Sequence, residues 1–166
     1  PTLERLRVLA QGSPTAQLLQ ALEADEPADV SSVAKRANLS SEESLLLAAT
    51  AVQEGMLVAL GSGALSSSTL LYTTAGWARL SGRAQQLLAA CHQQQPLRNG
   101  MPREELRNRL RLKAQTFSLA LQRLTEDRAL TDETGVVRLP EHSISLSPKQ
   151  REQMEAFVRA LEAEPF

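Results

Sequence analysis

Apolar positions recur along this chain with two periods, one of about 3.6 residues and one of about 2. The helical period first appears in PTAQLLQALEADEP (14–27), where Leu18, Leu19 and Leu22 share one face and Pro27 follows as a stop signal. It returns in LSGRAQQLLAACHQQQP (80–96), which ends at Pro96. The apolar stripe of that second segment consists of Leu80, Ala84, Leu87, Leu88 and Cys91. Both segments are therefore predicted to be amphipathic helices.

The chain also repeats itself. A shift of 73 positions, without gaps, aligns VAKRANLSSEESLLLAATAVQEGML (33–57) with LRNRLRLKAQTFSLALQRLTEDRAL (106–130). The apolar pairs in register are Val33 with Leu106, Ala37 with Leu110, Leu39 with Leu112, Leu46 with Leu119, Ala51 with Leu124 and Leu57 with Leu130. A fixed period of this length indicates two copies of one structural unit.

Each copy continues with the same order of elements. A short helix, a tight turn through 38–40 or 112–113 and a longer helix give the spacing of a helix-turn-helix. The period then shortens towards 2 in MLVAL and TLLYT around GSGALSSS, and in ALTD and VVRLP around ETG, which predicts a β-hairpin in each copy. The predicted fold class is mainly α with small β-hairpins, as tandem winged-helix domains.

The last segment begins like a third copy. Ser147, Pro148 and Gln150 offer an N-cap, a first-turn proline and a capping-box partner. The following apolar stripe of Met154, Phe157, Val158 and Leu161 is expected to dock on the second unit or on another chain. The predicted domains are residues 1–77, residues 78–143 and, for 144–166, the first helix of a truncated third winged helix. A start at Pro1 instead of Met agrees with a piece of a longer protein.

Composition limits the class of protein. Aromatic residues make up 3% of the 166, so the core has to be built from Leu, Ala and Val. A net charge of −1 provides no global attraction to nucleic acid or anionic lipid, so binding of either requires a local patch. The single cysteine excludes an intramolecular disulfide, and no apolar run is long enough to span a membrane. We expect a soluble, cytoplasmic protein without a membrane partner.

The sequence offers no catalytic constellation. His92 and His142 have no partner at metal-ligand spacing, and Cys91 lies on an apolar stripe, so we interpret them as two surface or hairpin-edge histidines and a core thiol. The glycines of GSG (61–63) are not followed by Lys-Ser or Lys-Thr, which excludes a phosphate-binding P-loop. We therefore predict no enzyme activity, no metal and no cofactor for this chain.

A basic stretch is the one candidate binding surface. PLRNGMPREELRNRL (96–110) and the residues up to Lys113 carry a local net charge of +4. Helical geometry places Arg103, Arg107 and Arg111 along one flank, whereas Arg109 is expected to pair with Glu105. The candidate RNA or phosphate contacts are Arg98, Arg103, Arg107, Arg111 and Lys113. The alternative, a solvated helix face whose arginine stems cover apolar surface, is the more common use of such a pattern.

The longer helices of the two copies differ in their suitability for DNA. SEESLLLAATAVQE (41–54) contains no Lys or Arg, so it cannot neutralise phosphates or read guanine in the usual way. In the second copy Lys113, Gln115, Thr116 and Arg123 are available, but Glu126 and Asp127 end that helix with negative charge. The first copy is thus predicted to be a spacer, and the second to hold the nucleic-acid surface if there is one.

Two motifs resemble a known family. H-x-x-x-P-L-R-x-G-M-P-R-E-E-L-R-x-R-L, here His92 to Leu110, and L-P-x-H, here Leu139 to His142, are similar to segments of the C-terminal region of bacterial selenocysteine-specific elongation factors, SelB. The resemblance extends from about 84 to 160 and is looser over the first copy, where LLQALEA and EGMLV match best.

The resemblance implies a place in translation. Members of the family consist of a GTP-binding elongation-factor part and a string of four winged helices that recognise a hairpin in selenoprotein messenger RNA, so that UGA is read as selenocysteine. On this alignment the chain holds the first two winged helices and the start of the third. The messenger-RNA hairpin, selenocysteinyl-tRNA and the ribosome would be partners of the complete factor, and this part would link its two ends, with weak RNA or ribosome contact of its own as an open possibility.

Two other classes remain open from the residues. One is a DNA-binding transcriptional regulator, which requires a basic recognition helix and usually a symmetric dimer. The other is a winged-helix scaffold that contacts only proteins. The sequence does not decide between the protein scaffold and the translation-factor linker.

Overall fold

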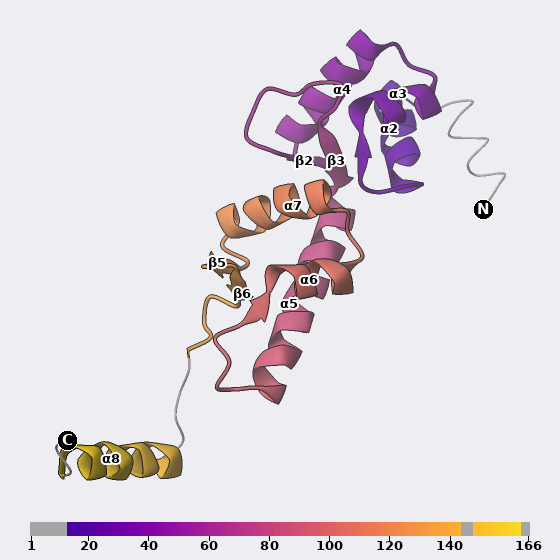
Figure 1. Cartoon of the computed structure of the whole chain (residues 1–166). Coiled ribbons are helices and arrows are strands. Elements are labelled where there is room, and N and C mark those ends of the chain that lie inside the picture. The colour runs from indigo at the N-terminus through magenta and orange to yellow at the C-terminus, as the bar shows by residue number, and fades with distance from the viewer. Residues whose placement is uncertain (1–12, 144–147, 164–166) are drawn as a thin grey trace.

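The structure, a computed structural model, describes residues 13–143 and 148–163 and contains two winged-helix units (Figure 1). Unit 1 begins with one helix, continues with a helix-turn-helix and ends with a hairpin. Its elements are α2 (Pro14–Glu23), β1 (Ala28–Asp29), α3 (Val30–Ala37), α4 (Ser41–Gln53), β2 (Leu57–Leu60) and β3 (Leu70–Thr73).

Unit 2 follows without a linker and has the same order of elements. They are α5 (Thr74–Gln94), β4 (Met101–Pro102), α6 (Arg103–Leu110), α7 (Ala114–Glu126), β5 (Thr131–Glu133) and β6 (Val136–Arg138). The predicted fold class, helical with small β-hairpins and built from winged helices, is confirmed.

The two units follow the 73-residue offset closely. Helices α3 and α4 correspond to α6 and α7 at that offset, at both ends of each helix. The backbone repeats as well, because Asn38 and Arg111 end the first helix of each pair with φ angles of 56° and 58°. This left-handed residue closes the helix and reverses the chain into the tight turn that the sequence predicted.

A third strand in each sheet was not predicted. The strand orders are β1-β3-β2 and β4-β6-β5, with Ala28 opposite Leu71 and Met101 opposite Val137. Met101 and Pro102, within the arginine-rich stretch, form β4, and α6 begins at Arg103. A strand of two residues is too short to show a period of 2, so the hairpin that it joins decides its structure.

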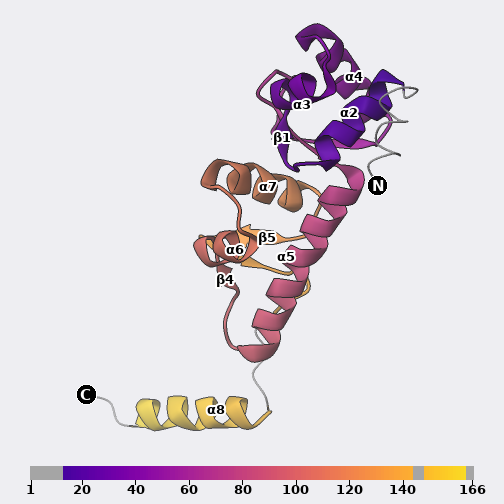
Figure 2. The same cartoon turned by 90° about the vertical axis from the view of Figure 1, so that its right-hand side faces the viewer.

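Helix α5 starts earlier than the stripe from Leu80 indicated. The hydroxyl of Thr73, the last residue of β3, accepts a hydrogen bond from the Gly76 backbone N–H at 3.0 Å and caps the helix there. Helix α5 therefore leaves the sheet of unit 1 directly and runs along the whole of unit 2 (Figure 2). The division between residues 77 and 78 falls inside its first turns, and the predicted domain ranges remain predictions.

The two hydrophobic cores are joined at the junction. One core lies within unit 1 and includes Leu18, Leu22, Val33 and Leu71. The other consists mostly of unit 2 residues but also contains Leu60 and Tyr72 from the hairpin of unit 1. The hairpin of unit 1 is thus part of the core of unit 2.

Helix α8 (Pro148–Ala163) follows unit 2 and lies apart from it in both views (Figures 1 and 2). Met154, Phe157 and Val158 of its stripe are exposed, so the expected docking of this stripe on unit 2 is not observed. The predicted N-cap residue Ser147 and the side chains of Gln150 and Leu161 lie outside the described residues.

Candidate nucleic-acid interface

The predicted arginine flank lies on α6, but its first two members are already paired. Arg103 forms an ion pair with Asp132 of β5 at 2.7 Å, and hydrogen bonding to this carboxylate raises the pKa of Arg103. Arg107 pairs with Glu104 one turn earlier, also at 2.7 Å. A phosphate would have to compete with these carboxylates, which are held next to the guanidinium groups.

Arg98 and Arg109 share one acidic partner. The predicted pair of Arg109 with Glu105 is present, at 2.7 Å. Arg98 lies 3.8 Å from the same carboxylate and donates a hydrogen bond to Gln95 at 3.0 Å. Since these groups are partly exposed, each pair contributes little to stability. Glu104 and Glu105 are already counted in the local charge of +4, so Asp132 lowers it only to +3, although four of the six cations lie next to a carboxylate.

Arg111 and Lys113 differ from the other three candidates. Both are exposed, and among the described residues neither has an ion-pair partner. Arg111 is the left-handed residue after α6, and Lys113 is the N-cap of α7. They lie in the turn of the helix-turn-helix, so Arg111 does not extend the flank as a helical residue.

Arg111 faces a groove at the junction of the units. The groove is lined by residues of α2 and the segment after it, of α5 and of the turn after α6, including Glu23, Glu26, Arg79, Arg83 and Arg111. Arg79 pairs with Glu26 at 3.2 Å, and Arg83 donates a hydrogen bond to the Arg109 carbonyl at 3.3 Å. Sequence reasoning missed Arg79 and Arg83, because they lie 32 and 28 positions before Arg111 and only the packing of α5 against α6 brings them near it.

The recognition helices are poorly placed for DNA. Helix α4 carries no Lys or Arg, as the sequence showed. One side of α7 packs against the hairpin β2–β3 with its connecting residues 61–69, called wing 1 below (Figure 1). Leu119 of α7 packs there, 3.8 Å from the position that a Cβ would take at Gly61. The exposed side of α7 presents Ser118, Gln122 and Glu126. Since Arg123 pairs with Asp127 at 3.0 Å, this side offers a phosphate little positive charge.

The two histidines are not separate surface residues. Their rings stack with centroids 3.5 Å apart, and His92 is buried, so the expectation of two surface or hairpin-edge histidines is wrong for His92. His92 Nε2 accepts a hydrogen bond from the Leu139 backbone N–H at 3.3 Å, and His142 Nε2 lies 3.1 Å from the Arg98 carbonyl oxygen. Both motifs that carry the family resemblance meet at this stack, which joins the end of α5 to the segment after β6.

Burial lowers the pKa of His92, and the neighbouring His142 and Arg138 lower it further. The geometry gives the same direction. A protonated imidazole would place a hydrogen on Nε2, where the Leu139 N–H already points. The neutral form of His92 therefore fits its structural contact with the segment after β6.

The other candidate groups show no chemistry of their own. Cys91 is a buried free thiol in the core, as predicted. Within the described residues no group of three or more His, Cys, Asp or Glu could hold a metal ion. No helix in that part of the chain is both long and apolar enough to cross a membrane.

Comparison with known proteins identifies unit 2. Residues 85–139 match a family model described as the winged helix of elongation factor SelB, the second such domain of that protein. The matched range runs from the middle of α5 to just past β6, and it contains Gly100, α6 and α7. The predicted family resemblance is confirmed by this match. No curated protein matches the chain.

Proposed function

We propose, from the premise that residues 85–139 are a SelB winged helix, that the chain is part of a selenocysteine-specific translation elongation factor of the cytoplasm. In this factor the two units act as a rigid linker between a GTP-binding part and the end that binds the messenger-RNA hairpin. The complete factor would bring the partners together: the selenoprotein messenger RNA, selenocysteinyl-tRNA and the ribosome. The chain itself has no catalytic role in this proposal.

The shared core carries the proposal. Tyr72 at the end of wing 1 and Trp77 in α5 lie with ring centroids 5.7 Å apart, and Leu60 joins the same cluster as Phe117 of α7. Trp77 Nε1 also donates a hydrogen bond to Asp127 after α7, at 3.2 Å. Domains that move independently meet in small, polar interfaces, whereas this junction is built from buried apolar side chains.

A buried carboxylate further fixes the direction in which α5 leaves unit 1. Glu26 belongs to the segment after α2 but lies close in space to the first turn of α5, and its side chain is 8% exposed. Its Oε1 accepts hydrogen bonds from the backbone N–H and the hydroxyl of Thr73, and its Oε2 pairs with Arg79. Glu26 follows α2, and Arg79 belongs to α5. These bonds therefore connect the end of the first helix of unit 1 to the start of the first helix of unit 2.

The arrangement favours a linker over a DNA-binding regulator. The recognition helix of unit 1 has no cation, and that of unit 2 packs one side against wing 1 and pairs Arg123 with Asp127, so neither is the basic helix that major-groove docking requires. A scaffold that contacts only proteins remains the second candidate, because the outer face of α4 exposes Leu46.

RNA contact by this part is a second element of the proposal. Of the five candidates, Arg98, Arg103 and Arg107 each have an acidic partner, which leaves Arg111 and Lys113 as the cations that a phosphate reaches first. Two cations support only weak binding, so we expect a contact that assists a complete factor already held by its other parts.

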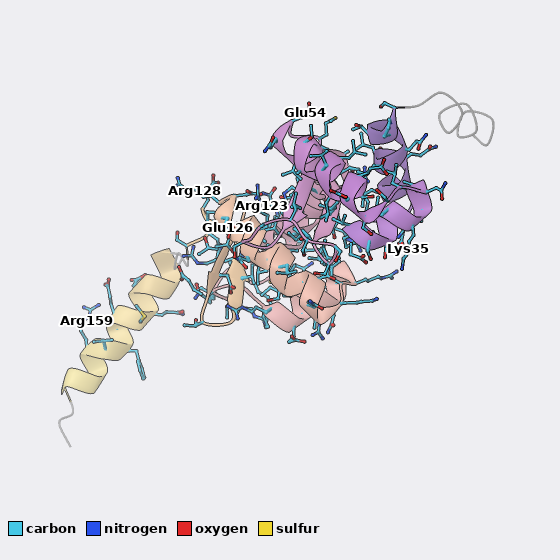
Figure 3. The ribbon with its side chains drawn as sticks, turned by 90° about the horizontal axis from the view of Figure 1, so that it is seen from above. Lys35, Glu54, Arg123, Glu126, Arg128 and Arg159 are labelled. Atoms are coloured by element: carbon cyan, nitrogen blue, oxygen red, sulfur yellow. The ribbon has the colours of Figure 1, made fainter. Side chains whose placement is uncertain are left out.

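The test of rigidity uses the distance between two spin labels. Lys35 and Glu126, which lie well apart in Figure 3, are changed to Cys in a Cys91→Ala background, and the distance distribution is measured by pulsed electron paramagnetic resonance. We expect one narrow distribution that broadens in the Leu60→Asp variant. A broad distribution in the parent chain would contradict the linker proposal.

The same substitution tests function in a complete factor that carries this region. Leu60→Asp should lower selenocysteine insertion at a UGA reporter codon while the amount of factor is unchanged. Gln86→Asp, on the exposed side of α5, serves as the control and should leave insertion unchanged. Equal selenocysteine insertion by both variants would show that the rigid junction of these units is not needed for the function of the factor.

The RNA contact is tested with residues that unit 1 supplies. Arg111→Asn and Lys113→Ser transfer the residues found at the equivalent positions of unit 1, Asn38 and Ser40, and asparagine suits the left-handed backbone. Binding of the labelled messenger-RNA hairpin is measured across a salt series, beside an Arg103→Gln, Arg107→Gln control that removes the same charge. We expect the first variant to bind more weakly and with a smaller salt slope than the control. If the Arg103→Gln, Arg107→Gln variant bound more weakly instead, the RNA contact would be assigned to the flank of α6.

A further inference from the structure

Helix α4 exposes an apolar residue that the fold does not use. Leu46 is 70% exposed, more than any other large hydrophobic side chain in the described part of the chain. Leu45 and Leu47 beside it are half-buried and pack against the core of unit 1. The exposed leucine therefore lies at the edge of apolar surface, on a helix that has no cation with which to bind a phosphate.

The residue equivalent to Leu46 in unit 2 is not exposed in the same way. Leu46 corresponds to Leu119 of α7 at the 73-residue offset. Leu119 is partly buried, because wing 1 lies over α7 and brings Gly61 and Leu70 to it. In unit 2 the surface around Leu119 of α7 is thus the surface against which wing 1 packs.

We propose that the outer face of α4 is a docking site for a β-hairpin of a protein partner, received in the way that α7 receives wing 1. The face, called the α4 face below, consists of Ser40, Glu42, Glu43 and Leu46. At the 73-residue offset these residues correspond to Lys113, Gln115, Thr116 and Leu119, which line the groove beside wing 1 in unit 2. This inference goes beyond the linker function and does not depend on it.

Charge defines the chemistry of the partner. Beside wing 1, α7 presents Gln115 and Thr116, which face Ser67 and Ser68 across a groove. The equivalent residues on α4 are Glu42 and Glu43. The carboxylate of Glu43 closes the capping box with Ser40, whereas Glu42 has no ion-pair partner among the described residues. The partner hairpin should therefore have Lys or Arg where wing 1 has serine, and an aliphatic residue over Leu46.

A second copy of this chain fits less well. Wing 1 is already packed against α7, and the turn of the unit 2 hairpin, residues 134–135, contains no Lys or Arg. That hairpin therefore offers Glu42 no cation at the place where wing 1 has its serines. The α4 face therefore fits a hairpin from another protein better than one from its own kind.

The test uses two probes made from wing 1. Residues 56–73 are synthesised as backbone-cyclised peptides, one with the native serines and one with Ser67→Lys and Ser68→Lys. Each is added to the isotope-labelled full chain, and the amide signals are followed by NMR. We expect both peptides to shift signals of α4, and the lysine peptide to bind more tightly than the serine peptide.

Three variants locate the site. Leu46→Ala should weaken binding of the lysine peptide by about tenfold, and Glu42→Gln should reduce its affinity to that of the serine peptide. Leu97→Ala removes another exposed leucine, 49% exposed, and serves as the control that should change nothing. Because Leu46 and Glu42 are exposed, we expect these variants to fold normally.

Several results would overturn the proposal. They are an absence of shifts in α4 with both peptides, binding unchanged by Leu46→Ala, and equal affinity for the serine and lysine peptides. Self-association of the chain that Leu46→Ala abolishes would identify a second copy as the occupant instead. Displacement of the peptide by RNA would assign the face to nucleic acid.

Discussion

Helix α5 contains two glycines that test how unit 1 is fixed to it. A Cβ added at Gly76 would lie 1.7 Å from Glu26 Oε2, whereas a Cβ at Gly82 would meet nothing within 4 Å. The carboxylate can swing away, because it is the end of a flexible side chain. Gly76→Ala should therefore fold but lose the bonds of Glu26, and Gly82→Ala should only gain helix propensity.

The magnitude follows from the bonds at Glu26. Both Thr73 donors end on one oxygen, so we count them as one charged hydrogen-bonded site worth about 1.5 to 3 kcal/mol. The ion pair with Arg79 adds less than about 1 kcal/mol, since the Arg79 side chain is 70% exposed. Alanine in a helix returns about 0.5 to 1 kcal/mol. Gly76→Ala should thus be destabilised by about 0.5 to 3.5 kcal/mol, and Gly82→Ala stabilised by about 0.5 to 1 kcal/mol.

The assay is urea unfolding, followed by far-ultraviolet circular dichroism and by the fluorescence of Trp77, which lies next to Gly76 in the shared core. A double-mutant cycle isolates the cause, because Gly76→Ala should cost nothing further once Glu26→Ala has removed the carboxylate. Equal stability of the two glycine variants would refute the role of Glu26. An additive cycle would show that the alanine acts through something else.

Three further outcomes are expected from the structure. Gly100→Ala should destabilise the chain by more than about 2 kcal/mol in thermal melts, because its Cβ would lie 2.5 Å from the Val137 carbonyl oxygen, a backbone atom that cannot swing away; a neutral effect would contradict this packing. The pKa of His92 is lowered in the folded state, so the folded state binds fewer protons and its contribution to stability is lost as the pH falls through about 6.5, the ordinary value. Urea midpoints between pH 7.5 and 5.5 should show this loss, and His92→Phe should reduce the pH dependence; a variant with an unchanged slope would exclude His92 as the cause. Leu60→Ala should cost about 2 to 4 kcal/mol and increase hydrogen exchange in both units, whereas exchange raised in unit 1 alone would contradict the shared core.

Local sequence signals determined the elements and their order. The stripe on α2, the turn after each short helix and the change of period at the hairpins depend on neighbouring residues, so they can be read without the fold. The register of the repeat was also correct, down to the left-handed residues Asn38 and Arg111. The family resemblance followed from two motifs, and the structure gives a physical reason for part of them, since Gly100 touches β6 and the two histidines stack.

Tertiary structure decided what those elements do. The third strand of each sheet exists only because a hairpin distant in sequence offers it hydrogen bonds. Arg103 and Asp132 are 29 positions apart along the chain, so their ion pair could not be predicted from the arginine-rich stretch alone. Leu46 and Leu119 look identical in the repeat, yet one is exposed and the other lies under wing 1. The burial of a side chain and the pairing of its charge depend on which surfaces come into contact. That contact is determined by how unit 1 packs on unit 2, and it cannot be predicted from the residues of one unit alone.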